Sequence, residues 1–146
     1  MKMEVLQEEK IREMIRLAIG QLAFSYSPYS RFKVGAALLC ADGRIYTGCN
    51  IENAAFTPGD CAERTAFCKA VSEGEKAFRA ICIVGGREGV LTGQTAPCGV
   101  CRQVMMEFCD PDDFEIILAT DEVHYQTYTL RQLLPLGFGP ADLRES

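Results

Sequence analysis

The sequence predicts an α/β protein, a three-layer α/β/α sandwich whose mixed sheet has roughly five strands. Apolar runs with strand composition alternate with helical segments of about a dozen residues, so most strands must be joined by crossover connections. An Asp-Gly pair, Asp42-Gly43, marks a tight hairpin between two of the strands. The length of 146 residues, of which 48% are apolar, suits one domain with a core of its own.

The first half of the sequence has the pattern of a helix, a hairpin and a second helix. Apolar residues recur at steps of three and four over 3–24, as on one face of an amphipathic helix, and Pro28 lies in the turn that ends it. The two runs beside the Asp-Gly pair have strand composition and are expected to pair antiparallel. The predicted elements are a helix over 3–24, strands over 32–40 and 45–49, a loop over 50–60 and a helix over 61–72.

The second half alternates buried strands with helices. A β-branched run closed by Gly85-Gly86 suits a strand buried on both faces. Pro97-Cys98 opens a helix that Asp110-Pro111 stops, so the next apolar run forms a further buried strand. The predicted elements are a strand over 78–84, a loop over 87–96, a helix from 97 to about 109, a strand over 114–119, a last strand or short helix over 127–134 and, at the end of the single domain 1–146, an irregular extension over 135–146.

Composition and charge exclude several classes of partner. The chain has 20 Asp and Glu against 15 Lys and Arg, a net charge of −5, and no basic cluster. A nucleic-acid partner is not expected, because binding to its phosphate backbone needs clustered Lys and Arg. The N-terminal residues lack the apolar stretch of a signal peptide, and no segment approaches the roughly 20 apolar residues that span a bilayer. We predict a cytoplasmic protein with neither a membrane nor a nucleic-acid partner.

Eight cysteines are many for a chain of this length. In a reducing compartment such residues are buried thiols, metal ligands or catalytic groups rather than disulfides. Five of the eight lie in apolar or strand-like segments and are expected to be packed thiols: Cys40, Cys49, Cys68, Cys82 and Cys109. The remaining three stand at predicted helix starts, where free backbone N–H groups and the helix dipole lower the pKa of a thiol and favour the metal-binding thiolate.

Cys61, Cys98 and Cys101 form a candidate metal site. Cys98 and Cys101 lie on one helical turn, although a Cys-x-x-Cys pair by itself also occurs in redox motifs and structural zinc sites. With Cys61 the set has three ligands, which leaves one tetrahedral zinc position for water, as in catalytic centres. Cys68 lies two helical turns beyond Cys61, too far away to be a fourth ligand. His124 is the only histidine, and we expect it in a solvated loop.

Glu63 is the candidate acid–base residue. It stands two residues after Cys61, in the first turn of the same predicted helix, where its carboxylate can reach the open metal position. There it can take a proton from zinc-bound water and return it to a leaving group. A glutamate in a first turn can instead merely complement the helix dipole. The neighbouring ligands favour the catalytic interpretation.

Two motifs around these ligands, CAERTA over 61–66 and PCGVCRQ over 97–103, resemble the cytidine deaminases of the small, three-cysteine type. Cys61 stands where the histidine form of the zinc-deaminase signature has its histidine. The likeness continues through 27–38 and 48–54 and covers most of the chain from about 25 to 138.

The resemblance implies the cytidine-deaminase fold and one Zn²⁺ per chain. It implies zinc-dependent hydrolytic deamination of cytidine and deoxycytidine to uridine and deoxyuridine, a reaction of pyrimidine salvage. Zinc-activated water would attack C4 of the cytosine ring, while Glu63 would protonate N3 and then the departing ammonia.

The same resemblance implies roles for residues outside the metal site. Asn50 and Glu52 would bind the sugar 3′-hydroxyl, the backbone N–H of Ala62 would hold the ring carbonyl, and Phe32 would pack against the pyrimidine. Asn50 and Glu52 are otherwise ordinary turn residues, and Phe32 a core aromatic. Phe138 would enter the site of a neighbouring subunit, which implies a homotetramer. The alternative for Phe138 is a local cap on its own core.

Three thiolates would leave a zinc centre with a net charge of −1, which calls for compensating groups. Arg64 and Arg102 are candidates for hydrogen bonds to the sulfurs, a role that the resemblance also suggests. Both are otherwise solvated helix residues. The chain departs from the family at Phe56, where tyrosine is common, so any hydrogen bond from that hydroxyl is missing.

Three other functions stay open at the level of sequence. A related zinc deaminase could act on a nucleoside antibiotic such as blasticidin S or on a base in a polynucleotide. Asn50 and Glu52 favour a substrate with an ordinary sugar, and the negative net charge of the chain disfavours nucleic acid. A non-catalytic zinc-binding module would use the cysteines for structure and would not need Glu63. A redox protein would form a disulfide between Cys98 and Cys101 and hold no metal.

Overall fold

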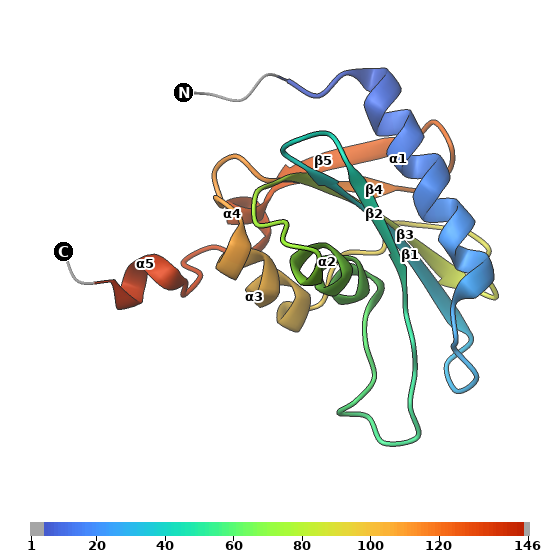
Figure 1. Ribbon diagram of the computed structural model, residues 1–146. Helices are drawn as coiled ribbons and strands as arrows, with labels where there is room; N and C mark the ends of the chain where they lie inside the picture. Colours follow the sequence, from blue (N-terminus) through green and yellow to red (C-terminus); the bar gives the residue numbers. More distant parts are fainter. Residues whose placement is uncertain (1–4, 145–146) are drawn as a thin grey trace.

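The computed structural model describes residues 5–144 and contains a five-stranded sheet in the order β2-β1-β3-β4-β5 (Figure 1). Only β3 and β4 pair in parallel, and the other neighbours are antiparallel, so the sheet is mixed as predicted. The strands are β1 (Phe32–Cys40), β2 (Ile45–Cys49), β3 (Phe78–Arg87), β4 (Glu115–Ala119) and β5 (Tyr125–Thr129).

Helices cover both faces of the sheet and complete the predicted three layers. The helix α1 lies on one face, whereas α2 and α3 lie on the other (Figure 1). None of the helices in the described part of the chain is long and apolar enough to cross a membrane. The helices are α1 (Glu8–Gln21), the short 3-10 helix η1 (Leu22–Phe24), α2 (Ala62–Ser72), α3 (Gly99–Phe108), α4 (Leu130–Leu133) and α5 (Pro140–Leu143).

The central strands divide the core into two halves because successive side chains of a strand point to opposite faces. On β3, Ile81 and Ile83 pack toward α2 and α3, whereas Cys82 and Val84 pack toward α1. The strand is therefore buried on both faces, as its β-branched composition predicts. In the half of the core between the sheet and α2 and α3, Phe67 of α2 packs against three other aromatic rings. Its ring centroid lies 5.0–6.2 Å from those of Phe78, Phe108 and Phe114.

Gly48 brings the start of α2 into direct contact with the sheet. A Cβ atom at this position would lie 2.4 Å from the carbonyl oxygen of Ala62 and 2.7 Å from the backbone nitrogen of Ala66. No side chain larger than hydrogen fits without moving the helix. The first turn of α2, which carries Cys61 at its N-terminus and Glu63, thus takes its position from a glycine on β2.

The structure corrects several predicted boundaries. The first helix begins at Glu8 rather than at residue 3, and residues 3 and 4 lie outside the described range. The strand β3 continues through Gly85-Gly86 to Arg87, because both glycines pair with β1 and leave room for Thr95 and the Val90 carbonyl, which pack against them.

The C-terminal region also differs in detail from the prediction. The segment predicted as a strand or a short helix contains both, since β5 runs directly into α4. Thr129 makes the change possible: its side chain accepts a hydrogen bond from the backbone of Gln132, whose side chain in turn binds the Thr129 N–H. The extension over 135–146 is not wholly irregular, because it contains α5.

Candidate active site

Three cysteine sulfurs converge between the starts of two helices. Cys61 is the N-cap residue of α2, Cys98 is the N-cap residue of α3, and Cys101 lies in the first turns of α3. The sulfur of Cys98 lies 3.8 Å from that of Cys61 and 3.5 Å from that of Cys101, and all three lie within 4.8 Å of one another. Neither N-cap residue uses its side chain to cap its helix, so the free N–H groups of both first turns lie next to Cys61 and Cys98.

The arrangement fits a tetrahedral zinc ion. With zinc–sulfur bonds of about 2.3 Å, two sulfurs of a tetrahedral site are about 3.8 Å apart. The separations at Cys98 are close to this value. Within residues 5–144, no fourth Cys, His, Asp or Glu joins the group. His124 lies instead in the turn before β5, where its Nδ1 atom is 2.7 Å from Asp121 Oδ2. Three protein ligands leave the fourth position open to a small molecule.

The protein environment favours the thiolate of Cys61. A hydrogen bond from the Cys101 thiol is the main cause that lowers the pKa of Cys61 to about 5, and Arg64 contributes because its Nη2 atom donates to the Cys61 sulfur at 3.5 Å. The same contact with Cys61, together with burial, raises the pKa of Cys101. Arg64, predicted to donate to the sulfurs, therefore contacts one of the three, that of Cys61.

Glu63 lies in the first turn of α2, beside the sulfurs, and only 4% of its surface is exposed. Burial is the main cause that raises the pKa of Glu63 to about 7, and the negative charge of Cys61 adds to the effect. A carboxyl group with such a pKa can both accept and donate a proton near neutral pH. The position is thus suited to acid–base chemistry.

A cavity of about 650 Å³ opens onto this group. Its wall combines the sulfurs of Cys61 and Cys98 with the carboxylate-bearing residues Glu52 and Glu63, and this size suits a small organic ligand. The cavity lies beside the loop between β2 and α2, which extends away from the body of the protein in Figure 1. Other lining residues include Tyr29, Asn50, Phe56, Asp60, Ala62, Arg64 and Thr95.

Asn50 and Glu52 line the cavity and also organise the segment before β1. The Oδ1 atom of Asn50 accepts hydrogen bonds from Ser25 Oγ and from the Val34 N–H, while its Nδ2 atom donates to the Phe32 carbonyl at 2.8 Å. Glu52 Oε1 accepts hydrogen bonds from two successive backbone N–H groups, those of Tyr29 and Ser30. The hydrogen bond from the Ser30 hydroxyl is the main cause that lowers the pKa of Glu52. Both side chains are therefore held rigidly at the cavity wall.

Three other predicted site residues lie elsewhere. Phe32, at the start of β1, is 40% exposed and is not among the described residues that line the cavity. Arg102 contacts no sulfur: its Nε atom donates to the Pro97 carbonyl at 2.8 Å and its Nη1 atom donates to the Leu133 carbonyl. Arg102 thus ties the loop before Cys98 to α4.

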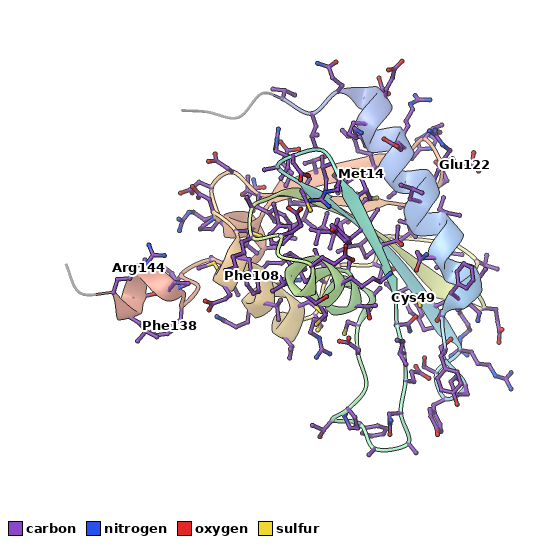
Figure 2. All side chains as sticks on the ribbon, viewed as in Figure 1. Met14, Cys49, Phe108, Glu122, Phe138 and Arg144 are labelled. Carbon is purple, nitrogen blue, oxygen red and sulfur yellow. The ribbon has the colours of Figure 1, made fainter. Side chains whose placement is uncertain are left out.

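Phe138 is 58% exposed, on the C-terminal segment that projects away from the sheet (Figure 2). It does not cap the core of its own chain. Its carbonyl oxygen accepts a hydrogen bond from Gln103 Nε2 at 2.8 Å, so α3 holds the segment at this point. Gln103 was not predicted as a site residue, although its place at the end of the motif over 97–103, two residues after Cys101, was a signal.

Four of the five cysteines expected to be packed thiols are buried, and one is not. Cys40, Cys49, Cys82 and Cys109 have little exposed surface, whereas Cys68 is exposed. The prediction for Cys68 is wrong because this residue lies on the outer face of α2, between buried neighbours of the helix.

The comparisons with known proteins agree with this geometry. Residues 8–114 match the family model described as "Cytidine and deoxycytidylate deaminase zinc-binding region". The chain is 48% identical to a cytidine deaminase of Sporosarcina psychrophila over 119 residues, which cover 82% of this chain and 84% of that protein. It is 43% identical to the cytidine deaminase of Halalkalibacterium halodurans over 132 residues, 90% of this chain and 96% of that protein.

The fold is shared as well. The crystal structure of a cytidine deaminase from Burkholderia pseudomallei superposes with a TM-score of 0.79 at 38% identity, covering 91% of this chain and 100% of the other. Sequence similarity of this extent, together with the converging cysteines and the buried glutamate, leads to one conclusion. The chain belongs to the cytidine deaminase family.

Proposed function

We propose that this protein catalyses the hydrolytic deamination of cytidine and deoxycytidine to uridine and deoxyuridine, as an enzyme of pyrimidine salvage in the cytoplasm. The observation that carries the proposal is the meeting of a three-sulfur site and the buried carboxyl of Glu63 on the wall of one cavity. Membership of the cytidine deaminase family supports the choice of substrate.

Cys61, Cys98 and Cys101 would hold the zinc ion. When bound, the metal supplies a Lewis acid that lowers the pKa of a coordinated water and makes it a nucleophile. Glu63 would take one proton from the attacking water and deliver it to N3 of the cytosine ring. It would then take the second proton from the hydroxyl added at C4 and pass it to the amino group, which would leave as ammonia while the C4 carbonyl forms. Its location two residues from Cys61 allows one carboxyl group to serve the water and the ring in turn.

Other groups of the cavity would bind and orient the nucleoside. The backbone N–H of Ala62, at the start of α2, would hold the ring carbonyl, and Asn50 and Glu52 would bind the sugar 3′-hydroxyl; that all three residues line the cavity supports these roles. For this contact Glu52 uses the acceptor capacity that its bonds to the segment before β1 leave free. Phe32, at the start of β1 and outside the described lining, would have to turn toward the cavity to pack against the pyrimidine, and Arg64 would offset the charge of the sulfurs.

The charge of the cavity supports a nucleoside rather than a nucleotide substrate. Glu52, Asp60 and Glu63 line it, and Arg64 is the one basic residue among the described lining residues. A 5′-phosphate would meet no cluster of arginines or glycine-rich loop of the kind that binds phosphate groups. An acidic cavity therefore favours an uncharged ligand.

We also propose a homotetramer in which Phe138 completes the site of a neighbouring subunit. Phe138 is more than half exposed and Leu136 is fully exposed, which leaves an apolar C-terminal segment available for contact with another copy. Light scattering measures the assembly directly. Mixing Glu63→Gln with Phe138→Ala protein should restore activity above that of either variant. In a hybrid tetramer, Glu63 of a Phe138→Ala subunit and Phe138 of a Glu63→Gln subunit can form one intact site. Failure to recover activity in hybrids would refute shared sites.

An ultraviolet assay of cytidine, deoxycytidine, cytidylate and blasticidin S, side by side, tests the proposed reaction. We expect turnover of the first two and little or none of the others. Preferential turnover of blasticidin S would identify a deaminase of nucleoside antibiotics. Lack of turnover of all four by zinc-loaded protein would favour a non-catalytic zinc-binding module.

A further inference from the structure

Asp60, directly before the metal ligand Cys61, has a rigid backbone. Its N–H donates to the Ile51 carbonyl at 2.8 Å, and the Ile51 N–H donates to the Asp60 carbonyl at 2.9 Å. Ile51 also pairs with Tyr26, so the segment is tied to the region before β1. The carboxylate of Asp60 therefore leaves a backbone that cannot easily move.

The carboxylate is directed at the first turn of α2. Its Oδ1 atom forms an ion pair with Arg64 Nε at 3.4 Å, and its Oδ2 atom accepts a hydrogen bond from Thr65 Oγ1 at 3.3 Å. The Thr65 hydroxyl also lies 3.0 Å from the Cys49 carbonyl and 3.2 Å from the Cys61 carbonyl, so its one proton is shared among three acceptors. The ion pair with Arg64 and this shared hydrogen bond orient the Asp60 side chain, which is 31% exposed.

Arg64 joins this carboxylate to the metal site. Its buried Nε atom has no hydrogen-bond partner among the described residues and lies 3.4 Å from Asp60 Oδ1 in an ion pair, while its Nη2 atom donates to the sulfur of Cys61 at 3.5 Å. A guanidinium group is planar, so holding the Nε edge also fixes the direction of the Nη2 atom. An arginine that lacked this contact would be free to turn away from the sulfur into the open cavity.

We propose that Asp60 is a positioning residue that holds the Arg64 guanidinium on the sulfur of Cys61 and thereby sets how much thiolate charge reaches the metal. The inference rests on the proposed function only in taking Cys61 as a metal ligand. A hydrogen bond to a ligating sulfur withdraws charge from it, which makes the cation a stronger Lewis acid. Asp60 acts on the reaction through Arg64 and need not touch the substrate.

Asp60→Ala tests the role by two measurements. We expect kcat for cytidine to fall on the order of tenfold, the size typical of lost partners of metal ligands, with KM nearly unchanged. In the cobalt-substituted protein, the thiolate-to-cobalt charge-transfer band should move to lower energy. The Cys61 sulfur loses the hydrogen bond from Arg64, so its electrons are held less tightly. Asp60→Glu, which keeps the carboxylate, should recover part of both properties.

A double-mutant cycle shows whether Arg64 carries the effect. Arg64→Ala should shift the cobalt band in the same direction, and adding Asp60→Ala to it should change kcat by less than about twofold, because coupled residues are not additive. Glu122→Ala, which removes an exposed carboxylate between β4 and β5, is the charge-matched control and should change neither property. Thermal unfolding checks that the variants fold.

The outcomes separate this inference from the proposed function. If the unmodified protein neither binds metal nor deaminates cytidine, the proposed function fails. If it does both, but Asp60→Ala leaves kcat and the cobalt band unchanged, the positioning role is wrong. A rise in KM alone, with an unchanged band, would overturn it by showing that Asp60 contacts the substrate.

Discussion

The Nε2 atom of Gln103 donates a 2.8 Å hydrogen bond to the carbonyl oxygen of Phe138. Gln103 lies on α3, two residues after the candidate ligand Cys101. Its neighbour Arg102 donates to the carbonyls of Pro97 and Leu133. The helix α3, with the candidate ligands Cys98 at its N-cap and Cys101 in its first turn, therefore also holds the C-terminal segment.

Gln103→Ala should loosen the C-terminal segment without removing the metal. A net hydrogen bond of about 0.5–1.5 kcal/mol corresponds to roughly two- to tenfold faster opening of the segment. Amide hydrogen exchange over 136–143 measures this change, and zinc content serves as the control. Unaltered exchange in this segment would show that the hydrogen bond does not hold it.

Glu63→Gln should keep the zinc ion and lose most of the activity. The amide has nearly the shape of the carboxyl group but cannot carry a proton, and general acid–base groups contribute typically 10²–10⁴-fold. Cytidine turnover and elemental analysis of the same preparation measure both properties. Full turnover with zinc still bound would exclude the proposed mechanism.

Cys98→Ala should lose both metal and activity, whereas Cys40→Ala should keep about one zinc per chain. Cys98 lies within 3.8 Å of another candidate ligand sulfur, while Cys40 is buried at the end of β1. Both changes remove one sulfur, so they form a matched pair. Equal zinc contents in the two variants would contradict the assignment of the ligands.

Gly48→Ala should destabilise the protein by about 1–3 kcal/mol, because the new methyl group overlaps the start of α2. Displacement of this turn should also weaken metal binding, since the turn carries Cys61. Gly20→Ala is the control: it lies in α1 with open space around it and should stabilise the helix by about 0.5–1 kcal/mol. Urea unfolding distinguishes the two, and equal effects would refute the steric argument.

Cys68 should be the thiol that reacts first with a soluble disulfide reagent in the zinc-loaded protein. It is exposed, whereas burial raises the pKa of Cys82 to about 12 and suppresses its thiolate. Cys68→Ser should abolish the fast phase, and removal of zinc by a chelator should add the ligand thiols. A fast phase that survives in Cys68→Ser would show that another cysteine is accessible.

Much of the fold could be read from local sequence. The Asp42-Gly43 turn and the runs beside it predict the hairpin of β1 and β2 with its observed bounds, because turn geometry and strand alternation act over a few residues. The end of β3 could not be read in the same way. Gly85-Gly86 looks like a strand terminator, yet the strand continues because β1, a strand distant in sequence, pairs with both glycines.

For the candidate site, the sequence by itself determined which residue types are present and at what spacing: three thiols and a glutamate at the starts of two helices, within motifs of one family. Only the tertiary structure decided what each neighbour contacts. It turned Arg64 toward a sulfur and Arg102 toward backbone carbonyls, and it left Phe138 outside its own core. Spacing along a helix is a local property, whereas a long side chain takes the partner that the folded chain places within its reach.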